Sequence, residues 1–218
     1  MKQKKFEIDA AKYYQNSKIA SNYDSERFTS LSGKTFNFLE KRKLSKIIDK
    51  LDTINIVLDA PCGTGRITEL LLKKGFTVTG GDISREMIDV AAKKLNQYRT
   101  KINFQNIDLT NTGVPDNYFD ASFCIRLLPH LPSNKRIAIL RELKRITNKY
   151  VIVTYSYSNL WLRLRRLFKV VLKQGFVKNA LAKNELQNEI NEAGLSIKHR
   201  FWSIPVISEE VILVLVSN

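Results

Sequence analysis

The sequence predicts an α/β fold in which helices cover both faces of a mostly parallel β-sheet. Short runs rich in β-branched residues alternate with amphipathic helical segments between residues 54 and 155. This alternation is typical of a parallel sheet with helices on its two faces. The last two apolar runs are joined only by the link from Pro205 to Glu209. So short a link requires those two strands to be antiparallel.

Length and composition favour one folded domain. The chain has 218 residues, of which 44% are hydrophobic, which is enough for a single sizeable core. The longest apolar run, Val211 to Val216, has the length of a strand and is far short of the roughly 20 residues that cross a bilayer. The basic start, Met1 to Lys5, is followed by no apolar stretch, so no secretory signal is expected.

Cysteine usage indicates a reducing compartment. The two cysteines, Cys62 and Cys124, lie in apolar or turn segments. They are too few for a disulfide scaffold and are not spaced like metal ligands. We therefore expect a cytoplasmic protein without a metal site.

The expected elements follow from hydrophobic periodicity, β-branched runs and turn residues. Residues 7–50 are predicted to be helical, with breaks at Ser21–Asn22 and around Ser32–Gly33. Strands are expected at 54–58, 76–79, 102–105, 118–125, 150–155, 196–204 and 210–216. Helices are expected from Gly65 to Gly75, from Ser84 to Leu95, and at 134–147, 159–182 and 184–193.

These elements suggest one domain spanning 1–218 with four parts. The parts are a helical N-terminal cap (1–50), a ligand-binding core (54–155), a basic helical insertion (158–183), and a helix with the terminal strand pair (184–218).

Two loops at the carboxyl ends of the first two strands carry the strongest site signal, because parallel α/β sheets bind ligands at that edge. Gly63 and Gly65 permit a tight turn and close approach of the backbone to a ligand. Asp59, before that turn, suits a cationic group. Asp82, at the end of the second strand, can accept from both hydroxyls of a ribose. The structural alternative is that Asp82 only caps the helix at Ser84.

The next two loops complete the expected site. Asp108 can accept from an adenine amino group while Ile107 packs against the ring. In the loop 126–132, His130 is the candidate general base, because the unperturbed pKa of histidine is about 6.5. The structural alternative is that His130 packs or hydrogen-bonds locally in the loop. Arg126 is suited either to an anionic substrate group or to a structural hydrogen bond.

Taken together, these motifs resemble the class I S-adenosylmethionine-dependent methyltransferases, close to the small-molecule type that includes the ubiquinone-biosynthesis methylases. The resemblance rests on Leu58 to Gly65, Val78 to Ser84, Asn106 to Asp108 and Tyr118 to Ile125. Tyr23 to Phe28 is similar to the segment that covers the cofactor in such enzymes. The resemblance implies a Rossmann-like seven-stranded sheet of order 3-2-1-4-5-7-6, whose last strand is antiparallel.

It also implies S-adenosylmethionine as cofactor and S-adenosylhomocysteine as product. The implied cofactor-binding residues are Asp59, Ala60, Cys62, Gly63, Gly65, Asp82, Ile83, Met87, Ile107, Asp108, Leu109, Ile125 and Arg126. The candidate substrate or lid residues are Tyr14, Tyr23, Arg27 and Trp161, with core packing as the alternative for the tyrosines. Methyl transfer is an in-line displacement, so a base such as His130 is needed only when the nucleophile arrives protonated.

Two other classes of protein are alternatives to a methyltransferase. A nicotinamide-dependent dehydrogenase is disfavoured, because its fingerprint requires a third glycine where Thr68 stands. A non-catalytic cofactor-binding protein stays open.

The charge distribution points to an anionic or amphiphilic partner. The formal net charge is +15, and residues 159–173 combine five Lys or Arg with an apolar face that includes Trp161. Such a segment is typical of a helix that lies on an anionic membrane, and its position also suits a substrate lid. We therefore expect a small or amphiphilic acceptor, with peripheral membrane contact as one option. A nucleic-acid substrate and a composition bias without function are the alternatives.

Overall fold

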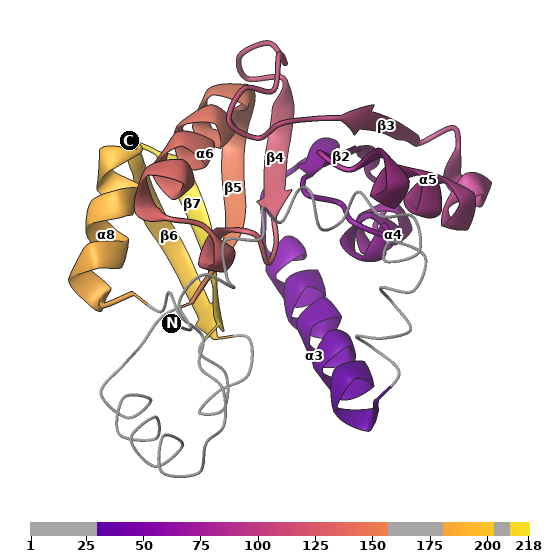
Figure 1. Cartoon of the computed structure of the whole chain (residues 1–218), viewed down its shortest axis with the longest axis horizontal. Coiled ribbons are helices and arrows are strands. Elements are labelled where there is room, and N and C mark those ends of the chain that lie inside the picture. The colour runs from indigo at the N-terminus through magenta and orange to yellow at the C-terminus, as the bar shows by residue number, and fades with distance from the viewer. Residues whose placement is uncertain (1–29, 157–180, 203–209) are drawn as a thin grey trace, which may run out of the picture. The chain divides into compact units, whose positions relative to one another are not determined.

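A computed structural model describes residues 30–156, 181–202 and 210–218 (Figure 1). They contain a seven-stranded sheet of order β3-β2-β1-β4-β5-β7-β6. The predicted α/β class and strand order are confirmed. By its internal contacts the chain divides into two compact units, Met1–Asp108 and Leu109–Asn218. They are called here the first and the second unit.

The first unit supplies three parallel strands and their helices. Its elements are α3 (Leu31–Ile48), β1 (Ile56–Asp59), α4 (Arg66–Lys73), β2 (Thr77–Asp82), α5 (Arg85–Lys94), the 3-10 turn η1 (Asn96–Tyr98) and β3 (Ile102–Asn106). In the register, Asp59 pairs with Gly80 and Asp82 pairs with Asn106. The carboxyl ends of the three strands therefore form one edge, where the sequence placed its polar loops.

Local sequence explains where these helices begin and end. Gly75, at a φ of +94°, follows the last turn of α4, as the sequence predicted. The hydroxyl of Ser84 caps α5 by accepting from the Met87 N–H at 3.2 Å. The break predicted around Ser32–Gly33 lies slightly earlier, at the N-cap residue Ser30. The hydroxyl of Ser30 accepts from the Gly33 N–H at 3.1 Å, so α3 begins at Leu31 and continues through Gly33.

The second unit completes the sheet with both parallel and antiparallel pairs. It contains β4 (Phe119–Cys124), the 3-10 turn η2 (Leu128–His130), α6 (Ser133–Ile146), β5 (Thr147–Ser156), α8 (Lys183–Glu192), β6 (Leu195–Trp202) and β7 (Glu210–Ser217). β4 and β5 are parallel, whereas β7 is antiparallel to both β5 and β6. Helices α6 and α8 lie side by side on one face of these strands (Figure 1).

Burial shows that β7, the last strand of the sequence, belongs to the hydrophobic core. All five residues from Val211 to Leu215 are fully buried in β7. The strand pair predicted from the short link between Pro205 and Glu209 is confirmed as antiparallel. β5 begins at Thr147 instead of Tyr150, because α6 passes directly into the strand at its C-cap residue.

Some sequence expectations fall outside the described ranges. These are the Ser21–Asn22 break, the basic segment 159–173, and the candidate residues Tyr14, Tyr23, Arg27 and Trp161. Within the described ranges, no helix is both long and apolar enough to cross a membrane.

Candidate functional site

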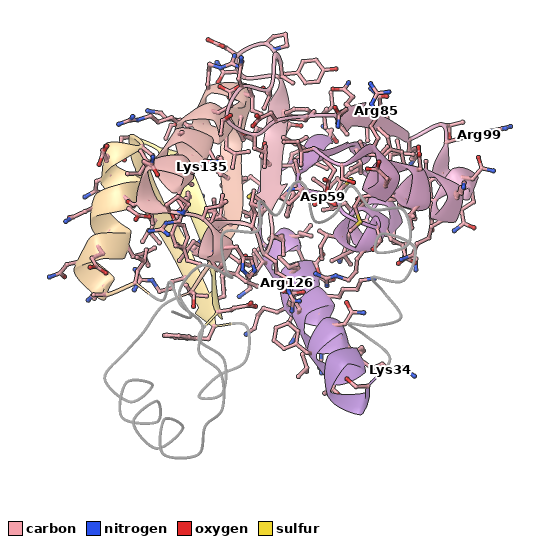
Figure 2. The ribbon with its side chains drawn as sticks, viewed as in Figure 1. Lys34, Asp59, Arg85, Arg99, Arg126 and Lys135 are labelled. Atoms are coloured by element: carbon pink, nitrogen blue, oxygen red, sulfur yellow. The ribbon has the colours of Figure 1, made fainter. Side chains whose placement is uncertain are left out.

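Asp59 ends β1 as a buried carboxylate with spare hydrogen-bonding capacity. Its side chain lies among those of the first unit (Figure 2), and the residue is only 1% exposed. Its Oδ2 accepts from Thr68 Oγ1 at 2.6 Å, whereas Oδ1 has no hydrogen-bond partner among the described residues. Burial raises the pKa of Asp59 to about 7, although the Thr68 hydrogen bond and the charge of Arg66 oppose the rise. The carboxylate is thus suited to a cationic partner.

The two glycines of the loop after β1 serve different purposes. Gly63 has a φ of +52°, and a Cβ there would meet nothing within 4 Å. Gly65 has a φ of +78°, but a Cβ there would lie 2.8 Å from Leu95 Cδ1 and 3.2 Å from Ala91 Cβ. Gly63 therefore leaves open space beside the backbone, whereas Gly65 is needed for close packing of α5. Close approach of a ligand to the two glycines stays a prediction, and the open space beside Gly63 is compatible with it.

Asp82 is held in place by backbone donors. Its Oδ2 accepts from the Gly63 N–H and its Oδ1 from the Ser84 N–H, each at 2.9 Å. The residue is 7% exposed, and burial raises its pKa against the lowering effect of these donors. Each carboxylate oxygen can accept a further hydrogen bond. The Asp82 carboxylate therefore orders the start of α5 and can still bind two ligand hydroxyls.

The second strand was predicted to end at Thr79, but Gly80 and Gly81 also lie within β2. A Cβ at Gly80 would lie 2.7 Å from a ring carbon of Phe104, and one at Gly81 would lie 2.8 Å from Ile107 Cδ1. These glycines therefore make room for side chains of β3 and of the turn after it. Asn106 adds a second support, since its Nδ2 donates to the carbonyls of Asp82 and Ile83 at 3.0 and 2.9 Å.

Apolar residues surround the polar strand ends. Ile107 and Met87 are buried, whereas Ile83, next to Asp82, is 43% exposed and Asp108 is exposed. An exposed apolar side chain next to a carboxylate suits a ligand that combines a flat apolar ring with hydroxyl groups.

Cys62 and Ala60, which were predicted to bind the cofactor, both lie in the loop after β1. Both are buried, and the Cys62 N–H donates to the Gly81 carbonyl at 2.8 Å. Burial and the charges of Asp59 and Asp82 raise the pKa of the Cys62 thiol well above its usual value. The thiol therefore stays protonated and is a poor nucleophile.

The remaining candidates belong to the second unit. Leu109 and Ile125 are buried. Arg126 directly follows Ile125, has a φ of +65°, and donates its backbone N–H to Thr154 Oγ1 at 2.6 Å. Its side chain is half-buried, and Figure 2 marks its place. His130 is exposed at the end of η2.

The sequence did not reveal two buried arginine–glutamate pairs. In the first unit, Arg66 Nη1 lies 2.7 Å from Glu40 Oε2. In the second, Arg136 binds both carboxylate oxygens of Glu189, and its Nη1 donates to the Leu131 carbonyl. Each pair joins helices that are distant along the chain, so no local spacing predicts it. The one hint was a glutamate on the apolar side of a predicted helix, which by itself identifies no partner.

Across the described ranges, no group of three or more His, Cys, Asp or Glu side chains is placed to hold a metal ion. The strand ends of the first unit thus bring together an open glycine turn, the ordered carboxylate of Asp82 and the buried carboxylate of Asp59.

Sequence and structure comparisons fit this geometry. Residues 57–149 match the family described as methyltransferase domain. These residues are thus similar to a methyltransferase domain, and the strand order is the one that the family resemblance implied.

A relative in sequence is the ubiquinone biosynthesis O-methyltransferase of Coxiella burnetii. The two are 40% identical over 81 residues, which is 37% of this chain and 35% of the relative. The match thus spans about a third of that protein.

Solved structures agree on the fold over nearly the whole chain. The magnesium protoporphyrin IX methyltransferase of Synechocystis PCC 6803, solved with bound SAH, superposes with a TM-score of 0.76 at 18% identity. The match covers 96% of this chain and 99% of that one. The [4+2]-cyclase SpnF superposes at 0.67 with 14% identity, over 96% and 95% of the two chains. Because the fold includes a cyclase, fold alone does not decide the reaction.

Proposed function

We propose that the chain is an S-adenosylmethionine-dependent methyltransferase whose cofactor binds at the strand ends of the first unit. The observation that carries the proposal is the pair of carboxylates around an open glycine turn. Asp59 has a buried oxygen without a partner, and Asp82 is fixed by the N–H of the open Gly63. This donor and acceptor set fits a cationic nucleoside with two ribose hydroxyls.

Each carboxylate then has a distinct role. Asp82 accepts from the ribose hydroxyls, and Asp59 offsets the positive charge of the methionine part. Ile83 and Ile107 pack on the adenine, and Asp108 accepts from its amino group. Bound S-adenosylmethionine supplies an electrophilic methyl group on a good leaving group. The protein therefore contributes mainly alignment of the reactants, an effect that can reach about 10 kcal/mol.

The second unit supplies the candidates for the acceptor side. His130 is proposed as the general base for a protonated nucleophile, and Arg126 as a contact to cofactor or acceptor. The exposure of His130 is compatible with proton exchange with solvent. We also propose that Tyr14, Tyr23, Arg27 and Trp161 contribute to closure over the site, and that 1–218 is a single methyltransferase domain.

The acceptor class is proposed from the charge and from the relatives. The named relatives act in ubiquinone biosynthesis or on magnesium protoporphyrin IX, and both names indicate a small molecule. The basic amphipathic segment 159–173 supports an amphiphilic acceptor and peripheral contact with an anionic membrane. A nucleic-acid acceptor is the second candidate, supported only by the net charge of +15.

A transfer assay tests the proposal. The protein is incubated with methyl-labelled S-adenosylmethionine and, in separate reactions, a catechol-type quinone precursor, magnesium protoporphyrin IX, anionic liposomes or total RNA. Label in an organic-extractable product supports the small-molecule assignment, whereas label in RNA supports the alternative. If S-adenosylmethionine binds but no acceptor becomes labelled, the catalytic assignment is not supported. H130A should abolish turnover and leave cofactor binding intact, and unchanged turnover would exclude His130 as the base.

A further inference from the structure

The first residue of α4 brings a positive charge to the glycine turn. Arg66 directly follows Gly65, and its side chain is 12% exposed. Its Nη1 lies 2.7 Å from Glu40 Oε2 and donates to Asn37 Oδ1 at 2.8 Å. Both partners lie on α3, and the Glu40 side chain is only 1% exposed.

This charge sits where a helix already favours anions. The N-terminus of a helix carries a partial positive charge and free N–H groups, so phosphates bind there readily. An uncompensated arginine at the same point strengthens that preference. The charge of Arg66 acts on Asp59, whose pKa it lowers.

The proposed cofactor has the opposite requirement. Its cationic sulfonium and ammonium groups outnumber its single carboxylate, so the ligand is a net cation and a net positive charge beside the turn opposes its binding. Glu40 supplies a compensating charge from a position that is almost fully removed from water. Solvent and salt screen such buried charges only weakly.

We propose that Glu40 is a specificity-determining residue: by neutralising Arg66, it makes the glycine turn select an adenosyl ligand with a cationic sulfur over one with a neutral sulfur. The inference rests on the proposed cofactor site. It assigns to α3 a role in cofactor choice that lies outside the cofactor loops.

A pair of ligands isolates this effect. S-adenosylmethionine carries the sulfonium charge, whereas S-adenosylhomocysteine has a neutral thioether at the same place. The ratio of their dissociation constants therefore reports the electrostatic potential at the sulfur. Loss of packing alone weakens both ligands alike and leaves the ratio unchanged.

The test is calorimetric titration of both ligands into the full chain and its variants. E40Q is expected to weaken S-adenosylmethionine about three- to tenfold more than S-adenosylhomocysteine. R66Q, which leaves the negative charge of Glu40 in place, should shift the ratio in the opposite direction. E40Q/R66Q, which removes both charges, should bring the ratio back close to that of the wild type.

The matched control is E69Q. Glu69 on α4 also joins that helix to α3, through Lys41 at 3.1 Å, but it lies one turn beyond Arg66. E69Q should change the ratio less than twofold. If circular dichroism shows that E40Q is unfolded, the role of Glu40 is tested instead by comparing the ratio of dissociation constants in R66Q with that in E40Q/R66Q.

The outcomes separate the inference from the proposed function. Equal effects of E40Q on the two ligands, or an R66Q ratio equal to that of the wild type, would overturn the role of Glu40 while leaving the cofactor site intact. A wild-type protein that binds neither ligand would overturn both.

Discussion

In the first unit, Asp59 and Asp82 end neighbouring parallel strands and receive few side-chain donors. In the second unit, Glu142 and Glu189 are each held by an arginine. Burial raises the pKa of Asp59 to about 7 and also raises that of Asp82. Arginine and hydroxyl donors lower the pKa of Glu142 to about 2 and lower that of Glu189 as well.

The difference separates carboxylates that keep hydrogen-bond acceptor capacity for a ligand from carboxylates whose ion pairs stabilise the fold. A buried acid with few donors destabilises the folded state when it ionises, but it keeps acceptor capacity. An acid saturated by arginine stabilises helix contacts and has little capacity left for a ligand. The same functional group, a side-chain carboxylate, thus belongs to the candidate site in one unit and stabilises helix contacts in the other.

The largest effect should follow from breaking the buried pair of the second unit. Among the residues that the structure describes, R136M leaves the Glu189 carboxylate with hydrogen bonds from the Ser133 and Tyr155 hydroxyls. Because an uncompensated buried charge is costly, we expect a loss of about 3–5 kcal/mol in the free energy of unfolding. Urea denaturation at pH 7 measures it. The double variant R136M/E189M should recover most of the loss, and a loss below about 1 kcal/mol in R136M would contradict the account.

Removing the charge of Asp59 should, in contrast, raise the free energy of unfolding. Its pKa is raised from 3.8 to about 7, so the folded state holds a proton that the unfolded state loses, and stability falls as the pH rises between these values. One pKa unit corresponds to about 1.4 kcal/mol. Because a buried amide has its own desolvation cost, we expect D59N to gain only about 2 kcal/mol at pH 8.

The pH dependence provides the control for this prediction. At pH 4 the folded wild type is already protonated at Asp59, so the gain from removing the charge is absent and the desolvation cost of the amide should leave D59N less stable by about 2 kcal/mol. Urea denaturation at pH 4, 6 and 8 measures the difference. A constant difference across this range would show that burial of the charge is not its source.

A smaller loss is expected at Glu142. Its carboxylate accepts from Arg145 and from the Thr112 hydroxyl at 2.7 Å, but the Arg145 side chain is 37% exposed. Solvent screening limits such a pair, so E142Q should cost about 1 kcal/mol at pH 7. Because the pKa of Glu142 is lowered in the folded state, its ion pair contributes fully to stability above pH 4.5. This contribution is lost as the pH falls through about 2. Thermal unfolding at pH 7 and pH 2 should show the difference only at pH 7.

The smallest effect serves as a matched control for the buried pair. Arg141 and Glu192 also join α6 to α8, at 3.1 Å, but both side chains are more than half exposed. R141Q should change the free energy of unfolding by less than about 0.5 kcal/mol. A loss like that of R136M would show that the contact between α6 and α8, and not burial of the charge, sets the size of the effect.

Sequence reasoning recovered what depends on local pattern. The strand order, the Ser84 cap and the terminal antiparallel pair follow from periodicity, turn residues and the family resemblance. It could not assign the two loop glycines to different roles, because packing of Leu95 and Ala91 on Gly65 depends on a helix later in the chain. For the same reason it missed the pairs Arg66–Glu40 and Arg136–Glu189, which exist only once distant helices have packed.

The most direct test of the central claim is calorimetric titration of S-adenosylmethionine into the wild type and D82N. The account predicts one binding site in the wild type. It also predicts an affinity at least tenfold lower in D82N, because the amide retains only one of the two acceptor oxygens that a ribose requires. Absence of binding to the wild type, or equal affinity in D82N, would contradict the assignment of these strand ends as the cofactor site.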